Sequence, residues 1–297
     1  MTEDGRRWLE LSVRSASAGE RAPLLAESLL ELGGRAAEER EGWYVTHVPE
    51  PQDLGRFLTD ARERISAEVG LSDLELLSSW RPHEEWADTW RRGLDSRRIT
   101  DRMVVRPTWV TPTFETDADI VILLDPGMAF GTAEHGTTRG CLRLLDQVVS
   151  AGDRVLDVGA GSGILSIAAA RLGASGVLSV ESDSLACEAL VENLHLNEVS
   201  DRVELLQIHA DSDWLSDQGF VSGIVANIET AILGPLLVGF ANALPEGAWL
   251  ILSGIMQEEW PEMLELAEAE GFQCVEVDSD GEWRSGLFRR RVGRVGT

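Results

Sequence analysis

Lysine is absent from this 297-residue chain, and arginine supplies all 26 of its basic residues. The 51 acidic residues leave a formal net charge of −25, and from Gly176 to Glu282 there are 22 acidic residues against one basic residue, Arg202. Binding of nucleic acid depends on neutralising phosphates, so we expect no direct nucleic-acid binding. An acidic surface attracts and steers a basic protein partner. Adaptation to salt or to genome composition is an alternative source of the acidity, and it is compatible with such a partner.

Cysteine and long apolar runs are also scarce. The three cysteines, Cys141, Cys187 and Cys274, are far apart in sequence, which fits neither a disulfide framework nor a zinc knuckle and predicts buried free thiols. The five histidines show no metal-ligand spacing, so no metal is expected. No stretch of about 18 apolar residues is present, which predicts no membrane association. The acidic N-terminus without a signal-peptide core predicts a cytoplasmic protein.

The first 70 residues alternate between strand and helix patterns. We predict strands over 7–14 and 42–48 and helices over 21–32 and 53–69, the first helix ending at Gly33-Gly34. This order predicts a small α+β module with a ferredoxin-like fold. No polar cluster stands out in it, so we interpret it as a recognition domain rather than a catalytic one.

The rest of the chain predicts a doubly wound α/β domain of the Rossmann-like type. Two apolar strands are expected over 102–110 and 120–124, and from Arg139 onward helix and strand alternate. The strands expected there are 154–158, 176–180, 203–208, 223–226, 248–253 and 273–277, with a final antiparallel strand over 283–290. We therefore predict a substrate-recognition domain over 1–72, a linker over 73–98 that contains a short helix (84–94), and a doubly wound α/β domain over 99–297.

A glycine turn carries the most specific local chemistry. Residues 155–163 read Val-Leu-Asp-Val-Gly-Ala-Gly-Ser-Gly, and Glu181 ends the next apolar strand. Gly159 and Gly161 let the backbone pass close to a ligand, and a carboxylate at that strand end suits a ribose diol. Dinucleotide binding requires G-x-G-x-x-G, whereas the spacing here is G-x-G-x-G. The pattern favours an S-adenosylmethionine site over a dinucleotide site, and it predicts that 99–297 is a class I methyltransferase domain; a structural turn without a ligand is the third possibility.

A second candidate follows the strand 223–226. The side-chain carbonyl of Asn227 can accept hydrogen bonds from an incoming amine and aim its lone pair at the sulfonium methyl, which makes Asn227 the candidate catalytic residue. Many amino-methylating enzymes carry two prolines and an aromatic after this position, where this chain has Ile-Glu-Thr. Without the aromatic there is no stacking partner for a flipped base. The pattern favours an aliphatic amine as acceptor; a simple turn residue is the alternative.

A loop ahead of the glycine turn is rich in hydrogen-bond donors. It spans Asp125 to Thr138 and reads Asp-Pro-Gly-Met-Ala-Phe-Gly-Thr-Ala-Glu-His-Gly-Thr-Thr. In it Phe130 can cover the methionine part of the cofactor, and Thr138 can bond the cofactor carboxylate near a helix start. His135 is a candidate base, although a lone histidine in such a loop is more often structural. Asp211 has two possible roles: its carboxylate can contact the adenine of the cofactor, or it can cap a helix.

Over nearly its whole length the chain resembles the ribosomal protein L11 methyltransferases. The resemblance implies that the N-terminal domain grips the ribosomal protein, that a hinge helix swings it over the catalytic domain, and that several lysine ε-amines and the N-terminal α-amine are methylated. It also places cofactor contacts on Thr138, Gly159, Glu181 and Asn227, with Phe130 nearby. The residues that carry it are Glu-Glu-Trp-Ala-Asp-Thr-Trp-Arg (84–91), the loop 125–138, the glycine turn, Ala226-Asn227-Ile228, Leu252-Ser253-Gly254-Ile255 and Gly281-Glu282-Trp283.

Two departures from the family pattern concern the cofactor pocket. Ala133 stands where the family loop usually has a second glycine, and if that position requires a positive φ, alanine would cost about 1 kcal/mol. Glu181 replaces the usual aspartate, although its longer arm still reaches a diol. Two other functions stay open: a class I methyltransferase acting on another protein lysine or a small amine, and a non-catalytic binder that keeps the cofactor fold. The intact Asn227, Glu181 and glycine turn argue against the binder.

Overall fold

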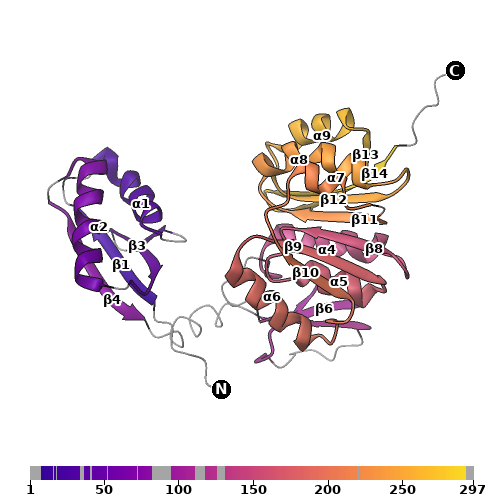
Figure 1. The fold of residues 1–297 in the computed structure, drawn as a ribbon, viewed down its shortest axis with the longest axis horizontal. Helices are drawn as coiled ribbons and strands as arrows, with labels where there is room; N and C mark the ends of the chain where they lie inside the picture. Colours follow the sequence, from indigo (N-terminus) through magenta and orange to yellow (C-terminus); the bar gives the residue numbers. More distant parts are fainter. Residues whose placement is uncertain are drawn as a thin grey trace. The chain divides into compact units, whose positions relative to one another are not determined.

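The protein is described by a computed structural model covering residues 8–15, 17, 19–33, 37–40, 42–51, 53–71, 73–81, 95–110, 118–125, 131–219 and 221–291. The chain divides into two compact units, Met1–Gly93 and Leu94–Thr297 (Figure 1). In the described part, no helix has the length and apolar character needed to cross a membrane. The predicted hinge helix over 84–94 falls outside the described residues.

The first unit is built on a four-stranded antiparallel sheet with the order β2-β3-β1-β4. Its elements are β1 (Trp8–Arg14), α1 (Ala22–Glu31), β2 (Ala37–Arg40), β3 (Trp43–Pro49), α2 (Leu54–Val69) and β4 (Glu75–Arg81). This βαββαβ order is the ferredoxin-like arrangement, as predicted. Both helices pack on the sheet, because Leu11 of β1, Leu25 of α1 and Ile65 of α2 belong to one buried cluster.

Local signals explain where the helices of this unit begin and end. The Asp53 side chain accepts a hydrogen bond from Arg56 N at 3.0 Å and caps α2. Gly70 ends α2 in the left-handed conformation, with φ 69°. Two strands of the unit, β2 and β4, have no counterpart among the predicted elements, so the sequence patterns recovered only half of the sheet.

The second unit contains a seven-stranded sheet with the order β10-β9-β8-β11-β12-β14-β13. The strands are β8 (Arg154–Val158), β9 (Gly176–Glu181), β10 (Val203–Gln207), β11 (Gly223–Asn227), β12 (Trp249–Met256), β13 (Phe272–Asp280) and β14 (Trp283–Arg290). β14 is antiparallel to both of its neighbours, whereas β8 to β12 are parallel. The strand order reverses between β8 and β11, and the carboxyl ends at such a switch point are where α/β sheets bind ligands.

Six helices cover the two faces of this sheet: α4 (Gly136–Val148), α5 (Ile164–Leu172), α6 (Ser184–Leu196), α7 (Ser212–Ser216), α8 (Thr230–Ala243) and α9 (Trp260–Ala269). Side chains alternate across the sheet, since Val155 lies in the core with α4, α5 and α6 while Leu156 lies in the core with α7, α8 and α9. The three cysteines are free; Cys141 and Cys187 are buried and Cys274 is partly exposed.

A small three-stranded sheet with the order β5-β6-β7 packs against the α4–α6 side of the second unit. It consists of β5 (Arg97–Arg98), β6 (Met103–Arg106) and β7 (Ile120–Leu123). The amide side chain of Asn193 on α6 accepts from Asp125 N and donates to Ser162 O, both at 2.9 Å. One buried asparagine therefore ties the end of β7 to the glycine turn and holds the two segments in register.

Candidate active site

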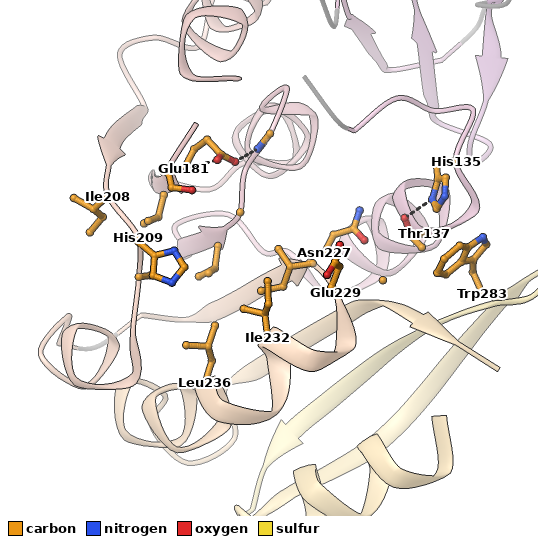
Figure 2. Close-up of a pocket in the computed structure, with 18 residues that line it drawn as sticks. His135, Thr137, Glu181, Ile208, His209, Asn227, Glu229, Ile232, Leu236 and Trp283 are labelled. Atoms are coloured by element: carbon orange, nitrogen blue, oxygen red, sulfur yellow. Dashed lines mark hydrogen bonds between the residues drawn. The ribbon is translucent and has the colours of Figure 1, made fainter. Parts of the chain in front are cut away.

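A cavity of about 600 Å³ opens at the carboxyl ends of the parallel strands (Figure 2). One side of it is formed by residues that follow β8, β9 and β10, and the other by residues around the end of β11, the first turn of α4, Gly254 and Trp283. The lining residues are His135, Thr137, Val158, Gly159, Gly161, Val180, Glu181, Ser182, Ile208, His209, Ala210, Asn227, Ile228, Glu229, Ile232, Leu236, Gly254 and Trp283.

The glycine turn after β8 adopts a conformation that side chains would not permit. Gly159 has φ 75°, and a Cβ there would stand 2.3 Å from Cγ2 of Ile228. Gly159 N and Ala160 N both donate to Val180 O, at 2.9 and 3.0 Å, which holds the turn against β9. Gly163 then starts α5 with φ 81°. The turn therefore exposes the backbone at Gly159 and Gly161 to the cavity.

Glu181 is the last residue of β9, the strand that pairs with β8. Its Oε2 accepts a hydrogen bond from Gly161 N at 2.9 Å, and its Oε1 accepts from Ser182 N and Asp183 N at 2.7 and 2.9 Å. The longer glutamate arm is thus folded back onto backbone N–H groups and fixed. A carboxylate has about four acceptor sites, and three of them are used here, so Oε2 keeps one site for a ribose hydroxyl.

Asn227 is the last residue of β11 and borders the cavity. It is 8% exposed, and its Oδ1 is buried without a hydrogen-bond partner among the described residues. Leaving a buried carbonyl unpaired costs about 1–3 kcal/mol. An amide oxygen in this state has its acceptor capacity available for a donor that enters the cavity.

Two glycines fix the peptide that follows Asn227. A Cβ on Gly254 would lie 2.2 Å from the carbonyl oxygen of Ile228, while the Cβ position of Gly159 meets the Ile228 side chain. Ile228 is therefore packed between the glycine turn after β8 and the bulge in β12 between Leu252 and Ile255. This packing leaves Asn227 little freedom to move its backbone away from the cavity.

The first turn of α4 contributes Thr137 to the lining, whereas Thr138 is fully buried and does not line the cavity. The Thr138 Oγ1 has no hydrogen-bond partner in the described structure. Phe130 lies outside the described residues. The cofactor contacts expected of Thr138 and Phe130 therefore stay predictions.

The backbone conformation of Ala133 shows that alanine is not strained at this position. Among the described residues only Glu198 combines a side chain with a positive φ, so Ala133 avoids the conformation that disfavours alanine. Its methyl group is 6% exposed and belongs to the core beside α4 and α5. The residue of this loop that does need the left-handed region is Gly131, with φ 101°, where a Cβ would approach Ser162 Oγ to 2.9 Å.

His135 lies at the cavity edge next to Trp283, with ring centroids 4.9 Å apart. Its Nδ1 is 2.7 Å from Thr137 Oγ1 (Figure 2). Burial lowers the pKa of His135 below its usual value, and the nearby Arg139 lowers it further. A neutral imidazole at neutral pH is the result, held in place by a hydroxyl and an aromatic ring.

Ion pairs anchor the start of α4 to β13. Arg139 donates to both carboxylate oxygens of Asp280, at 2.8 and 2.6 Å, and Arg143 does the same for Asp278 at 2.6 Å. The hydrogen bond from Arg139 lowers the pKa of Asp280 to about 2. Arg139 also donates to the backbone oxygens of Ala133 and Glu134. This network fixes the loop that precedes Thr137.

Comparison with known proteins places this geometry in one family. A family model described as ribosomal protein L11 methyltransferase (PrmA) matches residues 51–291. The chain belongs to the ribosomal protein L11 methyltransferase family. A relative of that name from Streptococcus pneumoniae is 32% identical over 95% of this chain and 96% of its own length, and one from Chloroflexus aurantiacus is 38% identical over 70% and 69%. A crystal structure of a ribosomal protein L11 methylase from Lactobacillus delbrueckii subsp. bulgaricus is 30% identical, with TM-score 0.59, over 67% of this chain and all of that chain.

Membership of this methyltransferase family confirms the predicted class I fold and S-adenosylmethionine as the cofactor. The residues present fit that group, because backbone at Gly159 and Gly161, a fixed carboxylate at Glu181 and an unpaired buried carbonyl at Asn227 border one cavity. The apolar side chains of Ile208, Ile232 and Leu236 border it as well. As the sequence predicted, the fold brings Gly159, Gly161, Glu181 and Asn227 to one cavity. Their contacts with the cofactor stay predictions.

Several lining residues of this methyltransferase escaped the sequence analysis. They are His209 after β10, Glu229 before α8, Ile232 and Leu236 on α8, and Trp283 at the start of β14. Two of them had a signal in the sequence: Glu229 stands two residues after Asn227, and Trp283 ends the Gly281-Glu282-Trp283 segment that carries the family resemblance. Asp211 does not line the cavity: its side chain accepts from Trp214 N at 2.8 Å and caps α7.

Proposed function

We propose that this protein transfers methyl groups from S-adenosylmethionine to amines of ribosomal protein L11, namely lysine ε-amines and the N-terminal α-amine. The observation that supports an amine acceptor is the buried, unpaired Oδ1 of Asn227 at the cavity. A carbonyl oxygen can accept an N–H of the amine and so turn the nitrogen lone pair toward the reacting carbon. The relatives of this chain are named as methyltransferases of ribosomal protein L11.

The chain's own residues act mainly by positioning. S-adenosylmethionine would supply a methyl group on a positively charged sulfur; transfer would replace the C–S bond by a C–N bond and leave S-adenosylhomocysteine. Glu181 and the glycine turn hold the adenosyl part, and Asn227 orients the acceptor. A lysine ammonium, with an ordinary pKa near 10.4, loses its proton to water before attack, because no described side chain at the cavity is an evident dedicated base. Alignment of the two reactants then supplies much of the rate gain.

The remaining assignments follow from this function. The first unit recognises the ribosomal protein and the second unit carries transfer. The linker with its hinge was predicted over 73–98, but β4 (Glu75–Arg81) belongs to the sheet of the first unit and β5 (Arg97–Arg98) to the second, so we place the linker between these two strands. The excess of acidic residues between Gly176 and Glu282 suits a basic protein substrate and disfavours direct contact with nucleic acid. A cytoplasmic location agrees with a ribosomal substrate.

Incubation of the protein with radiolabelled S-adenosylmethionine and a mixture of ribosomal proteins tests the proposal. Label is expected on L11, and digestion followed by mass spectrometry should place it on lysine ε-amines and the N-terminal amine. Label on a different protein, with none on L11, would show that L11 is not the substrate and would favour a lysine of another protein as acceptor. Failure of the protein to bind S-adenosylmethionine in calorimetry at millimolar concentration would remove the enzymatic proposal as a whole.

A further inference from the structure

Glu229 differs from the other carboxylate at the cavity. It lies at the N-cap position of α8, yet its side chain makes no capping hydrogen bond, and it pairs with no described residue. Glu181, in contrast, accepts three backbone N–H groups. Glutamate is not among the residues that usually cap a helix from this position, and without that bond the Glu229 carboxylate keeps its acceptor sites. Glu229 is exposed to solvent and borders the cavity instead.

The position of Glu229 relates it to the acceptor side of the cavity. It stands two residues after Asn227, and Figure 2 draws these two side chains together, with Glu181 and His209 toward the far side of the cavity. Its backbone is fixed by the same packing that holds Ile228, since Gly254 touches the Ile228 carbonyl oxygen. A carboxylate held at this point adjoins the place where the acceptor nitrogen must arrive.

The charges around the cavity favour a cation there. The ionisable lining side chains are Glu181, Glu229 and two histidines, and no arginine is among the lining residues. The pKa of His135 is lowered by burial, so that ring adds no positive charge at neutral pH. Glu229 is consequently a negative charge with no protein cation among the described residues to neutralise it.

We propose that Glu229 is the residue that recognises the ammonium group of the acceptor and delivers it to Asn227. This inference rests on the proposed transfer to amines. An amine with a pKa near 10.4 reaches the enzyme as an ammonium ion, and a charge-assisted hydrogen bond to a carboxylate is stronger than one between neutral groups. Because Glu229 is open to solvent, water beside it can take the proton that the ammonium loses before attack. A neutral amide or hydroxyl can donate a hydrogen bond to this carboxylate but lacks the positive charge that strengthens the bond from an ammonium group, so Glu229 favours a cationic acceptor.

A binding experiment with small probes tests this without depending on a protein substrate. The protein saturated with S-adenosylhomocysteine is titrated with n-propylammonium and with n-butanol, followed by NMR. Native protein should bind the ammonium ion, and Glu229→Gln should bind it about tenfold more weakly, the loss expected for one charge-assisted hydrogen bond. Butanol carries no charge, so it should lose much less affinity than the ammonium ion in Glu229→Gln. Glu265→Gln, which neutralises an exposed glutamate on α9, is the matched control and should behave as native.

Equal ammonium binding by native protein and Glu229→Gln, or no ammonium binding by native protein, would overturn the inference. Calorimetry with S-adenosylmethionine separates the other source of an ammonium group, the amino acid part of the cofactor. If Glu229→Gln loses cofactor affinity and keeps n-propylammonium binding, the carboxylate serves the cofactor and the inference is wrong. Methylation of L11 by native protein is scored separately, so failure on L11 counts against the proposed substrate alone.

Discussion

The backbone N–H of Gly161 donates to Oε2 of Glu181 at 2.9 Å and thereby joins the turn after β8 to the end of β9. The two residues stand 20 positions apart in the chain, and their strands are parallel neighbours in the sheet. The bond makes the glycine turn and the acidic strand end one structural unit. It also means that Glu181 helps to shape the turn besides offering an oxygen to a ribose.

Substitution of Glu181 tests this double role. Glu181→Gln places an NH2 donor where the structure has only N–H donors facing it, so one hydrogen bond is lost and an unfavourable contact is made. We expect the affinity for S-adenosylmethionine to fall about thirtyfold, or roughly 2 kcal/mol, in isothermal titration calorimetry. Glu188→Gln, at an exposed position on α6, is the control. An unchanged dissociation constant would show that Glu181 does not contact the cofactor.

Removal of the Asn227 side chain separates transfer from binding. Asn227→Ala deletes the carbonyl that orients the acceptor, and misplacement of reacting groups costs rate far more than affinity. We expect transfer to be abolished while the dissociation constant for S-adenosylmethionine stays within about tenfold of native. Asn242→Ala, on the exposed side of α8, should leave both quantities unchanged. Turnover near the native rate in Asn227→Ala would contradict the orienting role.

The loop before α4 offers a paired test of backbone conformation. Ala133→Gly should not improve cofactor binding, because Ala133 is outside the positive-φ region. It should lower the free energy of unfolding by about 1 kcal/mol through chain entropy and the lost buried methyl group. Gly131→Ala should cost more, about 2 kcal/mol, since φ is 101° there and its Cβ would crowd Ser162 Oγ. Urea unfolding measures both variants, and a more stable Ala133→Gly would refute the assignment.

Asp157 should make stability depend on pH. It is fully buried beside Ser166, whose hydroxyl donates to Oδ2 at 2.6 Å, and burial raises its pKa from 3.8 to about 7. The folded chain keeps this proton between those values while the unfolded chain loses it. The stabilising contribution is therefore complete below about pH 4 and disappears as the pH rises to about 7. Asp157→Asn removes that dependence.

The stability of Asp157→Asn relative to native protein should accordingly increase from pH 5.5 to about pH 7 and level off above it. Urea midpoints at several pH values measure the difference. Asp101→Asn, at an exposed aspartate, should show no such trend. A difference between Asp157→Asn and native that is constant across the range would mean that Asp157 keeps an ordinary carboxylate in the fold.

Elements that are bounded by clear turn signals, such as a run of glycines, were predictable from the sequence. β8 covers the predicted residues 154–158, because a glycine turn follows it directly. β2 and β4 were missed for different reasons. β2 reads Ala-Glu-Glu-Arg and forms an edge strand through backbone pairing with β3, without an apolar alternation to reveal it. β4 contains two adjacent serines that interrupt its pattern, and its pairing with β1 is between residues about 70 positions apart.

The site was predictable where function depends on backbone shape and on strand ends. Gly159, Gly161, Glu181 and Asn227 follow from local patterns, whereas Ile232 and Leu236 depend on how α8 is rotated. The sequence of α8 is apolar on nearly all sides, so no periodicity indicates which face meets the sheet. Packing of Leu233, Leu237 and Phe240 in the core decides it and leaves Ile232 and Leu236 at the cavity.

The packing of Ile228 between Gly159 and Gly254 links three positions that lie far apart in the chain. Volume in this part of the protein is shared: a methyl group at position 159 requires the side chain at position 228 to shrink by a comparable amount. The glycine at position 254 faces a backbone oxygen, so no choice of residue at 228 makes room for a larger one there. A smaller residue at position 228 would make room at position 159 but would leave the strain of a side chain at φ 75°, and at position 254 it would not even make room, so neither glycine can be replaced through a change at position 228 alone.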